Sequence, residues 1–211
     1  MGAYDCVDLF LIRHGITDWN IEKKYLGHTD RGVIKHELTR STALKEELQK
    51  MSFEAVFTSD LRRCQETLMF LSISGSPMID ARLREMDFGD WEGKTYDQLK
   101  DNEAYRSWLT NWELYSVPNG ESGEDFKTRI DSFLNDLFQQ IEKSSNKQSR
   151  RVLVMTHGGV IRYIFSKFQD TDSFWKIPIK HGTGIKLSLI REEGKWKCNS
   201  LSVVPLVENE K

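Results

Sequence analysis

Val7-Asp8-Leu9-Phe10-Leu11-Ile12-Arg13-His14-Gly15 is the stretch from which the fold can be inferred. A short, mostly apolar run leads directly into an arginine, a histidine and a glycine. Two further runs end in a similar way: Ala55–Phe57 precedes Thr58-Ser59-Asp60, and Val152–Met155 precedes Thr156-His157-Gly158-Gly159. Near-continuous apolar runs of this length are typical of strands buried on both faces of a parallel sheet. We therefore expect three parallel strands, each followed by a polar turn.

Helical patterns lie between these strands and after them. Apolar residues recur every three or four positions in four stretches, 44–51, 61–71, 126–141 and 160–168. Ser122-Gly123-Glu124-Asp125 offers a capping box for the longest helix. Two alternating runs, Ile185–Ile190 and Trp196–Val204, predict a hairpin at a sheet edge. The alternation of strand and helix predicts a three-layer α/β/α sandwich with a mostly parallel sheet.

The composition favours one globular domain and argues against several classes of function. A chain of 211 residues with 38% hydrophobic and 29% charged residues suits a single domain over residues 1–211. Its net charge of −2 argues against a nucleic-acid partner. No apolar run approaches the roughly 18 residues of a membrane span. Three cysteines without a CxxC pair indicate reduced thiols and a cytoplasmic location.

Residues 98–123 differ in composition from the flanking segments. They include the aromatic residues Tyr105, Trp108, Trp112 and Tyr115 and end near Val117-Pro118-Asn119-Gly120. Because this stretch is inserted between sheet elements, we expect it to form a small helical cap over the site.

The turns after the three strands carry the residues with chemical potential. Ligands of open α/β sheets bind outside the carboxyl ends of the strands, so His14, His157, Arg13 and an arginine of the Arg62-Arg63 pair should meet at one edge. Guanidinium groups and helix N-termini are the groups that bind a phosphoryl oxygen. A metal site built from the two histidines lacks a ligand spacing such as HExxH, so no metal is expected.

Four motifs, taken together, resemble those of the histidine phosphatase superfamily, also called the phosphoglycerate mutase-like family. In chain order they are Leu11–Asn20, Ser59–Arg63, Leu83–Gly89 with Trp91-Glu92-Gly93, and Thr156–Gly159. The resemblance implies a phosphoglycerate mutase-like fold. It also implies a phosphomonoester hydrolase that acts through a phosphohistidine on a small-molecule phosphate, without a cofactor. Separately, we expect a monomer or a homodimer.

The same resemblance implies a role for individual residues. His14 would attack phosphorus as a neutral imidazole, and Glu85 would protonate the leaving oxygen. The groups on the phosphoryl oxygens would be Arg13, Arg63, His157 and the Asn20 amide. Gly15 and Thr17 of the first motif are further candidates for substrate binding.

Other polar residues near these motifs have simpler explanations. Thr17 and Thr156 can stabilise turns as well as touch phosphate. Arg62 is expected to be a solvated charge, and Asp87 and Glu92 are expected to be surface or turn-capping groups rather than the acid. His28 is a candidate for the pocket mouth, whereas His36 and His181 belong to no motif.

The substrate is less well defined by the sequence than the reaction. Phe88–Glu92, Tyr105–Trp108 and Trp112 are similar to the α-ribazole-5′-phosphate phosphatase branch of the family, in which Trp108 would stack on an aromatic base. Packing of the cap onto the core explains the same tryptophan equally well. A broad-specificity phosphatase, a mutase and a non-catalytic binding module are alternatives. Lys24, Leu26 and the longer loop at 31–37 depart from the family pattern near the pocket mouth.

Overall fold

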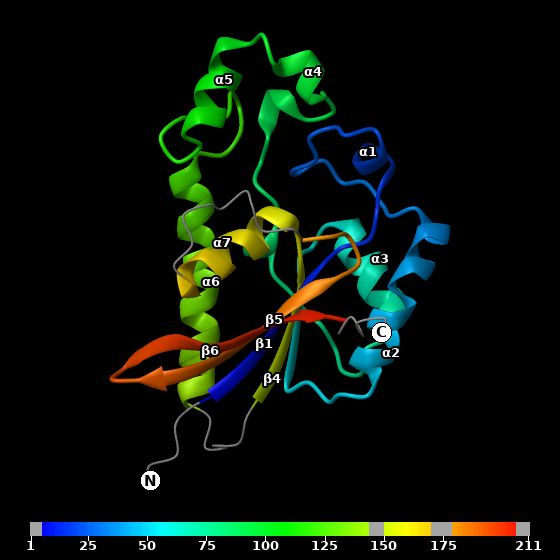
Figure 1. Ribbon diagram of the computed structural model, residues 1–211, viewed down its shortest axis with the longest axis vertical. Helices are drawn as coiled ribbons and strands as arrows, with labels where there is room; N and C mark the ends of the chain where they lie inside the picture. Colours follow the sequence, from blue (N-terminus) through cyan, green and yellow to red (C-terminus); the bar gives the residue numbers. More distant parts are fainter. Residues whose placement is uncertain (1–5, 144–149, 170–178, 206–211) are drawn as a thin grey trace, which may run out of the picture.

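The computed structural model describes residues 6–143, 150–169 and 179–205. Within them lies a six-stranded sheet with the order β3-β2-β4-β1-β5-β6 (Figure 1). The strands are β1 Cys6–Arg13, β2 Ala55–Thr58, β3 Met78–Ile79, β4 Arg150–Thr156, β5 Gly184–Glu192 and β6 Lys195–Val204. The pairs β1–β4, β2–β4 and β2–β3 are parallel, whereas β1–β5 and β5–β6 are antiparallel. The mostly parallel sheet and the edge hairpin predicted from the sequence are confirmed.

Helices connect and cover these strands. The α-helices are α1 Asp18–Ile21, α2 Thr42–Gln49, α3 Arg62–Leu71, α4 Tyr96–Leu99, α5 Glu103–Thr110, α6 Gly123–Lys143 and α7 Gly158–Phe168. Shorter 3-10 helices are η1 Lys35–Ser41, η2 Ala81–Leu83 and η3 Gly89–Trp91. Within the described residues, no helix combines the length and the apolar character needed to cross a membrane.

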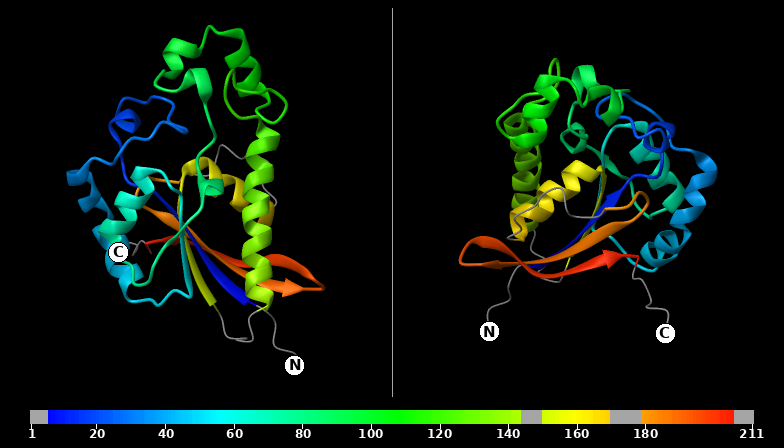
Figure 2. Two further views of the ribbon diagram at one scale, coloured as in Figure 1. Left: turned by 180° about the vertical axis from the view of Figure 1, so that it is seen from behind. Right: turned by 45° about the horizontal axis from the view of Figure 1, so that its top comes forward.

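The sheet separates two layers of helices. Leu9 and Leu11 of β1 pack into the hydrophobic cluster that α6 and α7 complete. Phe10 and Ile12 point to the other side, where they pack with α2 and α3. Successive strand residues face opposite sides of a sheet, so one apolar run supplies both cores. The helix pairs lie on either side of the strands in Figures 1 and 2, which confirms the three-layer sandwich.

The longest helix, α6, begins at the predicted cap. The Ser122 hydroxyl oxygen accepts a hydrogen bond from the backbone N–H of Asp125 at 3.0 Å. This bond satisfies one of the free N–H groups of the first helical turn. From there α6 runs along the whole height of the sheet, and its upper end meets the α4–α5 region (Figure 2).

An aromatic cluster connects the α4–α5 region to the rest of the molecule. Trp108 of α5 lies edge-on to Trp91, with ring centroids 5.4 Å apart, and stacks against Tyr105 at 6.3 Å. The Tyr105 hydroxyl is hydrogen-bonded to that of Tyr25 at 2.6 Å. The predicted cap segment, residues 98–123, is thus packed through its aromatic side chains onto Trp91 of η3 and onto Tyr25, which follows α1.

Strand β3 is absent from the sequence-based expectations. It has only two residues, and both Met78 and Ile79 are exposed. A strand of this length has no measurable periodicity, so pairing with Phe57 and Thr58 of β2 alone defines it.

Candidate active site

The carboxyl ends of adjacent parallel strands form the site. β1 and β4 pair with Arg13 opposite Thr156, and the backbone N–H of His14 donates to the Thr156 carbonyl at 3.0 Å. The imidazole centroids of His14 and His157 are therefore only 5.1 Å apart. β2 lies on the other side of β4 and leads into α3, which carries Arg63. The predicted meeting of two histidines and two arginines is present.

His14 is a buried imidazole with a defined tautomer. Its exposed fraction is 4%, and its Nδ1 lies 2.7 Å from the carbonyl oxygen of Gly15. A carbonyl only accepts, so Nδ1 carries the proton and Nε2 keeps its lone pair. Burial, and then the charges of Arg63 and Arg13, hold the pKa of His14 well below its usual range. The neutral form that a nucleophile requires is thus favoured.

Gly15 holds the His14 imidazole in place through its backbone, and its predicted role in substrate binding stays a prediction. Its carbonyl accepts from His14, and its N–H donates to the Thr67 hydroxyl at 2.8 Å. The same hydroxyl donates to the Arg63 carbonyl at 2.6 Å. Both backbone groups of Gly15 therefore have protein partners, and they tie the turn after β1 to α3.

Arg63 is a fully buried cation held by three hydrogen bonds. It donates to the carbonyl oxygens of Gly27 at 2.5 Å and Thr29 at 3.0 Å. Its Nε donates to Nδ1 of His157 at 3.3 Å. Burial lowers the pKa of Arg63, yet a guanidinium stays charged at neutral pH. Arg63 therefore brings a fixed positive charge to the edge of the sheet where His14 lies.

His157 uses both of its ring nitrogens on protein groups. Because Nδ1 accepts from Arg63, Nε2 carries the proton and lies 3.0 Å from the Ser59 hydroxyl oxygen. Cys64 Sγ is also close, 3.4 Å from Nε2. Burial, and then the charge of Arg63, hold the pKa of His157 well below its usual range. In this arrangement His157 orients Arg63, and a contact with a phosphoryl oxygen requires it to exchange Ser59.

Arg13 lies close to the first turn of α7. Its Nη1 donates to the Ile179 carbonyl at 2.6 Å, whereas its buried Nε has no hydrogen-bond partner among the described residues. Burial is the main reason that its pKa falls to about 10, so the group stays charged at neutral pH. A Cβ on Gly158 would lie 3.1 Å from the Arg13 guanidinium carbon. Glycine at this position therefore lets the guanidinium approach the backbone of α7.

Glu85 is held at the start of the same helix. Its Oε2 accepts from the Gly159 N–H at 2.9 Å, and its Oε1 accepts from the Met86 N–H at 3.0 Å. A carboxylate at a helix N-terminus is stabilised by the free N–H groups there. A Cβ at position 159 would lie 2.2 Å from Oε1, so this contact requires glycine.

Arg129 is a positioning residue that the sequence patterns did not reveal. From α6 it donates to the carbonyls of Arg82 at 2.6 Å, Arg84 at 2.7 Å and Glu85 at 2.9 Å. Its Nε also pairs with Glu121 at 2.6 Å. These bonds fix the backbone that carries Glu85. The only signal in the sequence is a charged residue beside an apolar helical stripe, which is typical of many solvated positions.

Two threonines and Asn20 stabilise the turns around the site. Thr17 is the N-cap of α1: its hydroxyl accepts from Asn20 N–H at 3.2 Å, and Asn20 Oδ1 accepts from Thr17 N–H at 3.1 Å. This capping box favours the turn-stabilising explanation for Thr17, and it leaves the Asn20 amide NH₂ outside the cap. Thr156 donates to the Leu83 carbonyl at 2.7 Å, so it too holds a loop.

Trp108 does not have the surface that ligand stacking needs. It is 1% exposed and is surrounded by Trp91, Tyr105, Phe88 and Tyr25. A base can stack only on an accessible ring face. The prediction that Trp108 binds substrate is therefore replaced by the packing alternative.

The remaining polar candidates mostly behave as expected. Arg62 is exposed and pairs with Glu66, Asp87 caps the turn at Gly89 through a bond of 2.9 Å, and Glu92 accepts from the N–H groups of His28 and Thr29. His28 lies 3.4 Å from an Asp87 oxygen and is 30% exposed. His36 is 82% exposed, on η1.

His181 was set aside in the sequence because it lies in no motif. In the structure its imidazole centroid is 5.4 Å from that of His14. Only the antiparallel pairing of β5 with β1 brings it there, and a lone histidine before an alternating run carries no local signal of such pairing.

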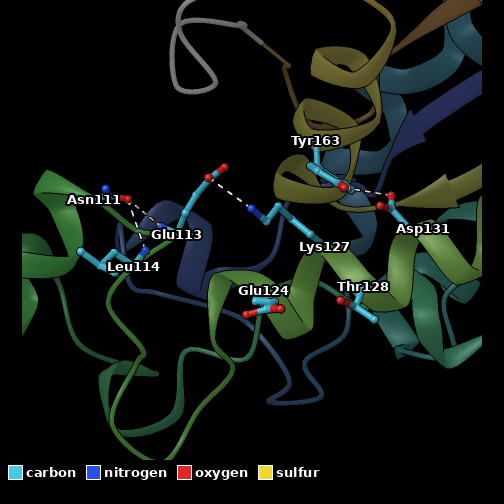
Figure 3. Close-up of a pocket in the computed structure, with 8 residues that line it drawn as sticks. All are labelled: Asn111, Glu113, Leu114, Glu124, Lys127, Thr128, Asp131 and Tyr163. Carbon is cyan, nitrogen blue, oxygen red and sulfur yellow. Dashed lines mark hydrogen bonds and ion pairs between the residues drawn. The ribbon is translucent and has the colours of Figure 1, made fainter.

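A small cavity adjoins the candidate site, and a larger hollow lies away from it. A cavity of about 60 Å³ adjoins Glu85, and its other lining residues are Met86, Phe88, Trp112, Phe126, Gly159 and Arg162. A larger open hollow of about 600 Å³ lies between α6 and the segment after α5, where Lys127 pairs with Glu113 and Tyr163 bonds to Asp131 (Figure 3). It contains none of the predicted site residues. No group of three or more histidine, cysteine or acidic residues in the described part of the chain is arranged to hold a metal ion.

Comparison with known proteins identifies a family. The family model of the histidine phosphatase superfamily (branch 1) matches residues 9–203. The adenosylcobalamin/alpha-ribazole phosphatase of Escherichia coli is 31% identical over 180 residues, covering 82% of this chain and 86% of its own. The metal-independent phosphoserine phosphatase of Arabidopsis thaliana is 29% identical, covering 95% and 83%. The crystal structure of the alpha-ribazole phosphatase from Shigella flexneri superposes with a TM-score of 0.76 at 26% identity, covering 96% of this chain and 100% of its own.

The buried histidines predict that the fold loses stability in mild acid. Folding lowers the pKa of His14, His157 and His181, the last to about 3, below the 6.5 of an unfolded histidine. Below pH 6.5 the unfolded chain therefore binds more protons, and stability falls with pH by up to about 1.4 kcal/mol per histidine and pH unit. Urea unfolding at pH 7.5 and pH 5 should show this loss. His181→Gln should reduce it, whereas the exposed-site variant His36→Gln should not; equal stability at both pH values would contradict the expectation.

Proposed function

Because the chain belongs to the histidine phosphatase superfamily and is a phosphatase, we propose that it hydrolyses small-molecule phosphate monoesters through a phosphohistidine on His14. The observation that carries the proposal is the neutral, buried imidazole of His14 beside the guanidinium groups of Arg13 and Arg63. The free lone pair on Nε2 is the nucleophile, and the cations attract the phosphate dianion.

The reaction has two balanced steps. In the first, Nε2 of His14 bonds to phosphorus while the bond from phosphorus to the ester oxygen breaks, and Glu85 gives a proton to that oxygen. In the second, Glu85 takes a proton from water, the water oxygen bonds to phosphorus, and the phosphorus–nitrogen bond breaks. One carboxyl group thus serves as acid and then as base. The hydrogen bonds from the N–H groups of Gly159 and Met86 hold the Glu85 carboxyl group in one position at the start of α7, and this position supports the assignment.

We assign the binding of the negatively charged phosphoryl oxygens to four groups. Arg13 and Arg63 supply fixed positive charge, the amide NH₂ of Asn20 supplies a neutral donor, and His157 contributes after exchanging Ser59. Preorganised donors in a buried site stabilise the transition state without reorganisation. A mutase would need the same groups together with a pocket that returns phosphate to a second hydroxyl.

Removal of the nucleophile should abolish turnover. His14→Ala is expected to lower kcat by at least about 100-fold, and it should also remove an acid-labile phosphate from enzyme quenched during turnover of a nitrophenyl ester. His36→Ala, at an exposed histidine on η1, is the matched control. A His14→Ala enzyme that keeps the labile phosphate would refute the assignment.

The proton donor should matter only where the leaving group needs a proton. Glu85→Gln is expected to lower kcat for alkyl phosphates by about 100-fold to 10,000-fold, and to lower it far less for nitrophenyl phosphate, whose anion leaves unaided. Steady-state rates on both esters measure the difference. Equal losses on the two would assign Glu85 another role.

For the physiological substrate we propose α-ribazole 5′-phosphate as the first candidate. The Escherichia coli and Shigella flexneri relatives bear that substrate in their names. The cavity next to Glu85 has aromatic walls, Phe88, Trp112 and Phe126, and apolar and aromatic walls suit a flat heterocycle. Because Phe88 is only half-buried, it replaces Trp108 as the candidate for stacking on the heterocycle.

A small polar ester such as phosphoserine is the second candidate. The cavity of about 60 Å³ is far below the roughly 300 Å³ at which ordinary ligand pockets begin. Arg162 lines it and would attract a carboxylate. The Arabidopsis thaliana relative is named for phosphoserine.

A substrate panel separates the candidates. If the aromatic wall selects the substrate, kcat/KM should be highest for α-ribazole 5′-phosphate, and Phe88→Ala should lower that value at least about tenfold while sparing alkyl phosphates. Trp108→Phe, within the buried cluster, should leave the substrate ranking unchanged. A wild-type preference for phosphoserine would select the second candidate.

A further inference from the structure

The segment before β5 wraps around the Arg13-His14 turn. The Gly182 N–H donates to the carbonyls of Arg13 at 3.2 Å and His14 at 3.1 Å. The Arg13 N–H in turn donates to the Thr183 carbonyl at 2.9 Å. On the other side of His181, the Ile179 carbonyl accepts from the Arg13 side chain. His181 therefore stands in the middle of a segment that is tied to the nucleophile on both sides.

Two imidazoles border His14, and they differ in how their nitrogens are used. His157, with its centroid 5.1 Å away, uses Nδ1 on Arg63 and Nε2 on Ser59. His181, with its centroid 5.4 Å away and its ring tilted by 58°, has a buried Nε2 without a hydrogen-bond partner among the described residues. Of the two rings that border His14, His181 is the one with a buried ring nitrogen that has no partner within the described part of the chain.

A second unpartnered donor lies nearby. Arg13 Nε is also buried without a partner within the described chain, and the charge of Arg13 acts directly on His181. Buried polar atoms are nearly always hydrogen-bonded, so each exception calls for an explanation. Two unpartnered atoms beside one nucleophile are explained together if an oxygen of the bound substrate is the missing acceptor.

The charge state of His181 suits such a contact. Burial, followed by the charges of Arg13 and Arg162, lowers the pKa of His181 to about 3. The other titratable group known to face it is His14, which is itself neutral. A neutral imidazole with its proton on Nε2 donates one hydrogen bond and does not repel the cations around it.

We propose that His181 is a catalytic residue of the phosphate site, whose Nε2–H donates to a phosphoryl oxygen that Arg13 Nε also binds. The inference rests on the proposed function, because it places the phosphoryl group at His14. It adds a donor from outside the four motifs and gives the segment before β5 a direct part in the reaction.

The test compares two variants of His181, one that keeps an aromatic ring and one that keeps a hydrogen-bond donor. His181→Phe retains an aromatic side chain without an N–H, and His181→Gln retains an amide N–H. Inorganic phosphate is the probe: its inhibition constant and the kcat/KM for nitrophenyl phosphate are measured for each. Loss of a hydrogen bond to a charged group predicts that His181→Phe weakens phosphate binding and lowers kcat/KM by about tenfold or more. His181→Gln should recover a large part of both, and His36→Gln should match wild type.

Each alternative outcome has a distinct meaning. The inference is wrong if His181→Phe and wild type bind phosphate equally. It is also wrong if His181→Phe and His181→Gln lose the same phosphate affinity and kcat/KM while both variants melt at the wild-type temperature. In either case His181 only packs against His14. His181→Leu replaces the Phe variant if the larger ring prevents folding. Phosphate binding is also measured by calorimetry, which needs no turnover. A wild type that binds phosphate through His181 but hydrolyses no ester would refute the proposed function and leave this contact standing.

Discussion

The parallel pairing of β1 with β4 is the constraint on which the rest of the site depends. It places Arg13 opposite Thr156 and lets the His14 N–H reach the Thr156 carbonyl. A shift of one residue would turn every side chain of β1 to the other face, exchanging the buried sets of the two cores. The hydrophobic pattern that fills the two cores therefore also sets the distance between His14 and His157.

This register places the guanidinium groups of Arg13 and Arg63 around the neutral imidazoles of His14 and His157. Arg63 is completely buried, which is costly for a charge unless hydrogen bonds replace water. The carbonyls of Gly27 and Thr29 supply those bonds, and Glu92 holds the loop that carries them. Burial, and then the charge of this cation, lower the pKa of both His14 and His157. Burial of arginine and neutrality of histidine are thus two results of one arrangement, which also attracts a phosphate dianion.

Much of this could be predicted, and the exceptions have a physical pattern. The three strand ends and the helices after them were predicted because periodicity and turn residues are local signals. Arg129 and His181 could not be found, since their partners lie far away in sequence: Arg129 bonds to residues 82–85, and His181 is brought to His14 by antiparallel pairing. Trp108 was ambiguous because an aromatic residue in a cap has the same composition whether it faces a ligand or the core.

The groups proposed to bind phosphate and the group proposed to protonate the leaving oxygen lie in different kinds of structure. Arg13, His14 and His157 lie at strand ends, where the sheet fixes the backbone, so a short motif specifies their geometry. Glu85 lies in a loop whose position depends on Arg129 and on the lack of a side chain at Gly159. Of the cavity walls beyond it, Phe88 comes from the same loop as Glu85, whereas Trp112 follows α5, and both pack through aromatic contacts. Such walls can vary without disturbing the sheet. We therefore expect the short motifs to determine the reaction type and the packing of the aromatic residues to determine substrate choice.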